Sequence, residues 1–339
     1  MTADSSKPVR SGSQDERISD GKPCVLVCID LAKETREIIP PAKAIARALN
    51  AELAFVHVIK AHGRAEDGSP VDPVEWEIMR REAKAHMERF AQEHADGDET
   101  LTTHLFEGNC TDQICEVMAS RPQDIAVLGR GHDETGAHIG ETAREMLESG
   151  HNSLFLVPFG VEPKRKFSRI LVPLDCSRRS ERILPLVEKI ARSESAEVVL
   201  VHAVPEPVLT DAGPSEPSDK ELISQLNKRN ERVAKTYLDR LSARIGAGGV
   251  RVRSLLLRGG DIRRQLAATI EEQAIDLLVL ASHGQSGFAD VAFGDVANYL
   301  IRTSNVPTMV IRFGGNATEK HAFSQARSKG ARSPGTLAQ

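Results

Sequence analysis

The residues best placed to hold a ligand lie in 276–295, which reads DLLVLASHGQSGFADVAFGD. The apolar run 277–280 is typical of a strand that is buried on both faces. Small residues follow, among them Gly284, and the stretch ends with Gly294 and Asp295 before a helical pattern. A strand, a glycine-containing loop and a helix N-terminus can direct backbone N–H groups toward an anion. This stretch is therefore the first candidate for a ligand site.

Two aspartates, Asp30 and Asp175, each follow an apolar run that predicts a strand. In open α/β sheets, ligands bind beyond the carboxyl ends of the strands, so both aspartates are candidates for ligand contact. An aspartate at that place can equally form a turn or cap the next helix, and this alternative stays open. His283, inside the glycine-containing stretch, contacts either ligand or backbone.

The remaining histidines and the cysteines predict no metal or catalytic site. His57 and His202 lie within apolar strand patterns, and we expect each ring to be hydrogen-bonded at a strand end. His132, His138 and His151 match no zinc-binding spacing. The five cysteines form no C-x-x-C pair, so we expect reduced, structural thiols. No pairing of a nucleophile with a base is recognisable, so no enzyme is expected.

These candidate residues need a scaffold, and the apolar pattern predicts one. Apolar runs alternate with segments of helical spacing, so the chain reads strand, helix, strand from end to end. That order requires a parallel sheet with helices on both faces. The longest helix expected in the first half, 74–94, is amphipathic, with Val74, Ile78, His86, Phe90 and His94 on its apolar side.

The chain is a duplication. Residues 26–59 match residues 171–204 at a constant offset of 145, which pairs His57 with His202. The offset grows to 152 and then 154 further along, as loop lengths change. We therefore expect an α/β protein of two tandem, Rossmann-like domains, each a sandwich around a five-stranded parallel sheet.

The expected limits are 22–160 for domain 1 and 161–313 for domain 2, joined at a basic link that begins domain 2. The tails 1–21 and 314–339 are polar and without a period, which predicts disorder. The second tail is basic, and we expect it to be solvated.

Composition limits the partners. The net charge is −4 and the pI is about 6.3, which gives no electrostatic argument for nucleic acid. No apolar run is long enough to span a bilayer, and the first residues lack the apolar core of a secretory signal. We therefore expect a cytoplasmic protein without a membrane or nucleic-acid partner; its protein partner is unknown.

Several motifs of domain 2 occur in an order and spacing that resemble the universal stress protein superfamily, and the chain resembles its tandem form. These motifs are ILVPLD (170–175), LVHAV (200–204), LRGGD (257–261), DLLVLASHG (276–284) and VPTMVIR (306–312). The resemblance implies five-stranded folds similar to adenine nucleotide α-hydrolases. It also implies that some members bind ATP through one sequence motif. The motif consists of Gly-x-x-Gly, then nine residues of any kind, then Gly followed by Ser or Thr. The positions that match are Asp175, Ala203, Ala281, Gly284, Gly294 and Asp295.

This sequence departs from the ATP-binding pattern. Ala281 stands at the first glycine, and Asp295 stands at the hydroxyl residue that would hold phosphate. A carboxylate there repels a triphosphate. In domain 1 the glycine spacing is lost, and Glu141 follows Gly140.

The resemblance implies a stress-response module that binds a ligand or a partner, with nucleotide binding altered or lost. Two alternatives stay open: a regulator that holds ATP or another adenine nucleotide in domain 2, with slow hydrolysis, and a scaffold. In the family the fifth strand pairs in a dimer. We expect 154–157 to pair antiparallel with 309–311, forming a pseudo-dimer within one chain, and a further homodimer stays open.

Overall fold

The computed structural model describes residues 22–30, 36–59, 72–96, 101–119, 121, 123–130, 139–149, 152–205, 217–282 and 294–312. The strands are β1 (Cys24–Cys28), β2 (Glu52–Ile59), β3 (Thr102–Glu107), β4 (Ile125–Arg130), β5 (Ser153–Pro158), β6 (Arg169–Pro173), β7 (Glu197–Val204), β8 (Arg251–Arg258), β9 (Leu277–Ala281) and β10 (Thr308–Ile311). The helices are α1 (Ile39–Leu49), α2 (Pro73–His94), α3 (Cys110–Ala119), α4 (Glu141–Ser149), α5 (Arg178–Glu181), α6 (Leu184–Glu194), α7 (Pro217–Ala247), α8 (Ile262–Glu272) and α9 (Asp295–Thr303), with a 3₁₀ turn at Arg36–Ile38.

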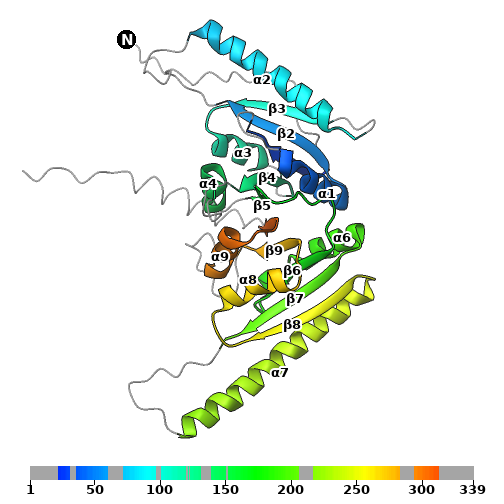
Figure 1. Cartoon of the computed structure of the whole chain (residues 1–339), viewed down its shortest axis with the longest axis vertical. Helices are drawn as coiled ribbons and strands as arrows, with labels where there is room; N and C mark the ends of the chain where they lie inside the picture. The colour runs from blue at the N-terminus through cyan, green and yellow to red at the C-terminus, as the bar shows by residue number, and fades with distance from the viewer. Residues whose placement is uncertain are drawn as a thin grey trace, which may run out of the picture.

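The ten strands form one sheet with the order β3-β2-β1-β4-β5-β10-β9-β6-β7-β8 (Figure 1). Within each half the strands are parallel, and the halves repeat the same order outward from the centre. The halves meet where β5 and β10 pair antiparallel, with Phe155 opposite Met309. This confirms the predicted parallel halves and the predicted antiparallel pairing of the fifth strands. The paired residues begin at Thr308, one residue earlier than expected.

Helices cover both faces of the sheet, as the alternating element order predicts (Figure 1). One apolar core lies under α1, α2, α6 and α7, and a second lies under α3, α4, α8 and α9. Strand residues divide between the cores by alternation: Val25 and Val27 face the first, and Leu26 faces the second. Aliphatic side chains dominate both cores, which fits an aromatic content of 4%.

The duplication extends to the helix ends. Proline occupies the first turn of both α1 and α6, where its missing N–H would have no helical partner. Both helices end at a non-glycine residue in the left-handed conformation, Asn50 with φ 52° and Ser195 with φ 55°. Pro40 and Pro41 therefore begin α1 and do not kink it.

Helix α2 departs from its predicted pattern. Val74 and Ile78 are 65% and 51% exposed, whereas buried side chains occur only at Met87, Phe90 and Ala91. The helix therefore packs on the sheet through its last turns. The apolar spacing correctly predicts a helix here. It does not predict where the sheet beneath that helix ends.

Two buried arginines tie the domains together besides the central strands. Arg130, at the end of β4, donates to the carbonyls of Ile301 and Ser304 at the C-terminus of α9. Arg312, after β10, donates to the carbonyls of Met146 and Leu147 in α4. Each cation thus caps the negative end of a helix that belongs to the other domain. Burial lowers the pKa of Arg312 to about 10, and the guanidinium remains charged at neutral pH.

Candidate functional site

The strand order defines where a ligand would sit in domain 2. From β6 the chain moves outward through β7 and β8, and it then returns to the other side of β6 with β9. The boundary between β6 and β9 is therefore the topological switch point, where open α/β sheets leave a crevice at their carboxyl ends. Asp175 follows β6, Ala281 ends β9, and Ala203 lies next to the end of β7. The structure brings these three predicted residues to one edge of the sheet.

Asp175 forms a turn at this edge. One carboxylate oxygen, Oδ1, accepts the backbone N–H of Ser177 at 3.0 Å. The Ser177 hydroxyl then accepts the N–H of Ser180 at 3.1 Å and caps the short helix α5. The turn-forming alternative therefore applies to this aspartate. In domain 1, Asp30 is exposed at the matching place.

The two repeated histidines have the structural role that the sequence predicted. His202 Nδ1 lies 2.7 Å from the carbonyl oxygen of Leu174, and His57 Nδ1 lies 2.8 Å from that of Ile29. Each ring thus bonds the residue just after the neighbouring strand, and it holds the segment that carries the aspartate.

Cys176 is a residue of this edge that the sequence analysis overlooked. All five cysteines are free in the structure, and Cys176 is the exposed one, so it does not have the buried, structural role that was expected of all five. Its Sγ lies 3.7 Å from Nδ1 and 3.8 Å from Nε2 of His202. Its φ is 64°, a left-handed conformation that is uncommon outside glycine. Burial raises the pKa of this thiol, and Asp175 and Glu181 raise it further, so it is protonated at neutral pH.

The N-terminus of α9 completes the described part of the edge. Gly294 is the N-cap, with φ −68° and no side-chain cap, so the first N–H groups of the helix carry no capping bond from it. Among the described residues, a Cβ at Gly294 would meet no atom within 4 Å, so neither their packing nor the backbone conformation requires glycine here. Asp295 is exposed in the first turn. Asp261 raises the pKa of the Arg263 guanidinium most, and Asp295 makes a smaller contribution in the same direction. His283 and Gly284 lie outside the described residues.

At the corresponding edge of domain 1, an aromatic ring covers the end of β4. Gly129, in β4 at the place that Ala281 holds in β9, lies under the ring of Phe159. A Cβ at Gly129 would come 2.1 Å from Cζ of that ring. The next residue, Arg130, is buried and directed toward α9. Glu141 begins α4, as Asp295 begins α9. In domain 1 the ring of Phe159 therefore occupies the space above Gly129, whereas Phe313, its counterpart at offset 154, lies outside the described residues.

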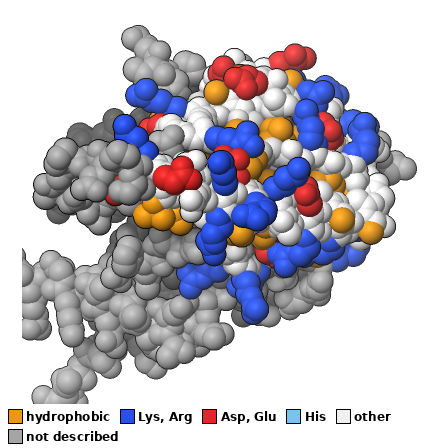
Figure 2. Space-filling view, turned by 90° about the horizontal axis from the view of Figure 1, so that it is seen from below, with side chains coloured by type: hydrophobic (Ala, Val, Ile, Leu, Met, Phe, Trp, Pro, Cys, Tyr) orange, Lys and Arg blue, Asp and Glu red, His pale blue; other side chains and the backbone are white. Residues whose placement is uncertain are grey.

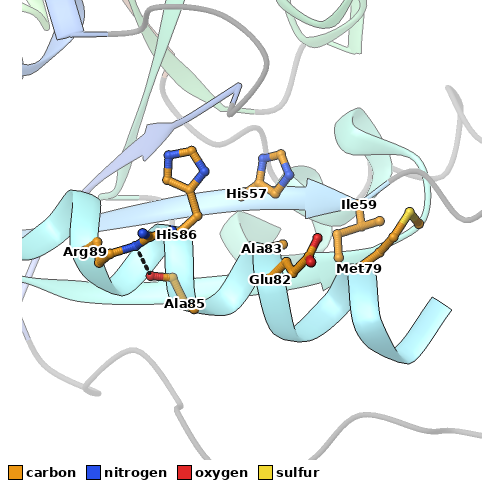
Figure 3. Close-up of a pocket in the computed structure, with 8 residues that line it drawn as sticks. All are labelled: His57, Ile59, Met79, Glu82, Ala83, Ala85, His86 and Arg89. Atoms are coloured by element: carbon orange, nitrogen blue, oxygen red, sulfur yellow. Dashed lines mark hydrogen bonds between the residues drawn. The ribbon is translucent and has the colours of Figure 1, made fainter. Parts of the chain in front are cut away.

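A hollow of about 580 Å³ lies elsewhere in domain 1, between β2 and α2 (Figure 3). The rings of His57 and His86, the side chains of Ile59 and Met79, and Glu82 line it. In domain 2 the ring of Tyr237 lies beside His202, at 6.5 Å between ring centres. Among the described residues, no three His, Cys, Asp or Glu side chains come together as a metal site. The hollow is therefore open and is lined by both polar and apolar side chains. Its described residues form no recognisable group that would bind a metal ion.

Within the described parts of the chain, no helix is both long enough and apolar enough to cross a membrane. Part of the chain resembles known single proteins in sequence. A universal stress protein of Methanocaldococcus jannaschii is 22% identical over 155 residues, which is 43% of this chain and 95% of that protein. Universal stress protein YxiE of Bacillus subtilis is 21% identical over 148 residues, 43% of this chain and 99% of its own. Each relative thus has the length of one domain.

Solved structures resemble the whole chain. A universal stress protein from Archaeoglobus fulgidus has a TM-score of 0.61 at 17% identity, covering 86% of this chain and 98% of that one. A functionally unknown protein from Pseudomonas aeruginosa PAO1 has the same TM-score at 12% identity, covering 91% and 98%. The sequence profile of the universal stress protein family matches twice, at residues 24–158 and 166–312. The chain therefore belongs to the universal stress protein family and carries two of its domains in tandem.

Proposed function

We propose that this protein is a stress-response ligand-binding module whose ligand site lies in domain 2. The ligand class that fits is an adenine nucleoside or nucleoside monophosphate, held at the switch point between β6 and β9. Asp175 and Ala203 face the nucleoside, and Ala281, His283, Gly284, Gly294 and Asp295 border it. One observation carries the proposal: the N-terminus of α9 has no side-chain cap, and among the described residues no atom lies within 4 Å of a Cβ built at Gly294, which leaves room for a ligand there.

The preference for few phosphates rests on Asp295. Its carboxylate is exposed in the first turn of α9, where the helix dipole already stabilises it. A triphosphate directed at that helix end would meet a like charge at close range, and each such contact weakens binding. A nucleoside or a monophosphate places less charge there. The rival assignment, an ATP-binding regulator with slow hydrolysis, requires Asp295 to be neutralised by a metal ion.

In this proposal domain 1 has a structural role, as the partner of domain 2 in a pseudo-dimer. The β5–β10 pairing and the arginines that cross between domains support a built-in pseudo-dimer, which replaces the dimer of two separate chains. We assign no catalysis to either domain. Five free thiols support a cytoplasmic location.

Isothermal titration with adenosine, AMP, ADP and ATP–Mg²⁺ tests the proposal. We expect adenosine or AMP to bind more tightly than ATP. In Gly294→Asn the new side chain caps α9 and occupies the space at the helix end, so we expect binding to weaken about tenfold or more while stability is kept. Gly140→Asn, the same change before α4 in domain 1, is the matched control and should bind normally. Failure of all four compounds to bind contradicts the proposal.

A further inference from the structure

The net charge of −4 conceals an uneven distribution of charge between the two domains. Residues 22–160 contain 14 Lys and Arg against 24 Asp and Glu, whereas residues 161–313 contain 23 against 19. The chain is therefore strongly acidic at one end and basic at the other. Such asymmetry between halves points to a charged partner, which the whole-chain charge does not indicate.

The positive charge of domain 2 concentrates on α7. This helix has seven basic and four acidic residues, and all seven basic side chains are exposed. Lys228, Arg229, Arg232 and Lys235 are spaced so that they share one face of the helix, here called the basic stripe. Figure 2 views this end of the molecule and shows many Lys and Arg side chains spread over it, with several Asp and Glu side chains among them. Beside α7, the outer strand β8 adds the exposed Arg251 and Arg258.

The ion pairs near the basic stripe involve other side chains. Among the described residues, no carboxylate forms an ion pair with any of its four side chains. Two nearby carboxylates bind other cations: Glu231 pairs with Arg258 at 3.1 Å, and Glu181 pairs with Arg240 at 3.1 Å. Like charges one turn apart repel each other and destabilise a helix, as Lys228 and Arg232 do. An anionic partner would remove that repulsion.

Helix α2 provides an internal comparison, because it is the copy of α7 in domain 1. Its buried Met87 and Phe90 correspond to the buried Leu238 and Leu241 at an offset of 151. At that offset Arg81 corresponds to Arg232 and Lys84 to Lys235.

The two helices differ in what surrounds these cations. In α2 the residue one turn before Arg81 is Glu77, which pairs with it at 3.0 Å. In α7 the residue at the same place is Lys228. Arg229 of α7 likewise corresponds to an uncharged residue of α2, Ile78. The basic stripe is thus a property of the second copy and not of the fold.

We propose that the basic stripe, with Arg251 and Arg258 beside it, binds the phosphate backbone of duplex nucleic acid. Phosphates are held by Lys and Arg without regard to sequence, which suits a row of exposed cations on a rigid support. At about 1.5 Å per residue, the 31 residues of α7 span roughly 46 Å, enough to follow several phosphates of a duplex.

Other anionic partners fit the surface less well. Membrane-surface helices insert an apolar face, but that face of α7 is buried, at Ala234, Leu238 and Leu241, against the sheet. A protein partner would need a dry apolar centre, and the exposed large apolar side chains of α7 are only Leu222 and Val233 among the described residues. Single strands bind by stacking on exposed aromatic rings, and Tyr237, the only aromatic residue of α7, is half-buried beside His202.

Fluorescence anisotropy with a labelled DNA duplex of about 25 base pairs, at several salt concentrations, tests the proposal. The full-length protein should bind at about 50 mM NaCl, with affinity that falls steeply as salt rises. Arg232→Gln/Lys235→Gln should bind at least tenfold more weakly at that salt, with a salt slope shallower by about two. Arg81→Gln/Lys84→Gln in α2 is the matched control and should bind as the wild type does.

Three results would overturn the proposal. The first is no binding of the duplex at about 50 mM NaCl with protein at about 100 µM. The second is equal binding by the wild type and the stripe variant, checked with Lys228→Gln/Arg229→Gln as a second stripe variant. The third is binding only to a single strand of the same length or only to vesicles that contain phosphatidylserine. Circular dichroism of each variant confirms that it is folded.

Discussion

The guanidinium of Arg47 and the carboxylate of Glu194 join the two domains, with 3.2 Å between Nη2 and Oε1. Arg47 lies in α1 and Glu194 in α6, helices that pack against each other across the centre of the sheet. The Glu194 side chain is 2% exposed, and its second oxygen accepts the N–H of Phe167 at 3.1 Å. A carboxylate this deeply buried depends on both partners.

Arg47→Met should therefore lower the free energy of unfolding by about 2 kcal/mol, because it leaves a buried carboxylate without its counter-charge. Urea unfolding measures the change. Arg81→Met removes the exposed pair with Glu77 and should cost less than about 0.5 kcal/mol. Equal effects of the two substitutions would show that the pair between the domains is not structural.

The contact between Gly129 and Phe159 makes a second prediction about stability. A methyl group at Gly129 cannot fit under the ring, so Gly129→Ala should cost about 1–3 kcal/mol. Phe159→Ala removes the obstacle, and the double variant should therefore lose less stability than the two single changes summed. Strict additivity in a denaturant-unfolding cycle would contradict the close contact.

Cys176 gives a direct probe of the domain 2 edge. The native protein should react with a maleimide at one thiol, because Cys176 is the exposed cysteine, and five should react after denaturation. A raised pKa means that little thiolate exists at pH 7, so the rate should climb about tenfold per pH unit up to and beyond pH 9.

Two changes should alter that rate in opposite directions. Glu181→Gln removes a carboxylate that raises the pKa, so labelling at pH 8 should be faster. A bound nucleoside should slow labelling, because Cys176 lies next to Asp175. Cys176→Ser is the control that abolishes native labelling. A rate that is flat between pH 7 and pH 9 would contradict the assignment of the thiol environment.

The features that the sequence predicted well are those that the duplication repeats. The alternation of strands and helices and the histidine bonds of His57 and His202 each occur twice, so a chance pattern was improbable. Apolar periodicity and chain connectivity then left one arrangement for each half of the sheet.

The features that the sequence did not predict depend on contacts between distant residues. His202 lies 26 positions after Cys176, and Arg130 caps a helix that ends more than 170 positions later. Nothing in the local sequence signals either contact. The exposure of Val74 depends on where the sheet ends beneath α2, which helical spacing does not encode. The glycine loop with His283 and Gly284 lies outside the described residues, and its role stays a prediction.

Titration of Asp295→Ser tests the central claim most directly. The wild-type protein should bind AMP or adenosine more tightly than ATP. Removing the carboxylate and restoring a hydroxyl should raise the affinity for ATP about tenfold, equivalent to about 1.4 kcal/mol, and leave that for adenosine unchanged. Glu141→Ser, the equivalent change in domain 1, should alter neither. Wild-type protein that binds ATP as tightly as AMP, with no change in Asp295→Ser, would contradict the account.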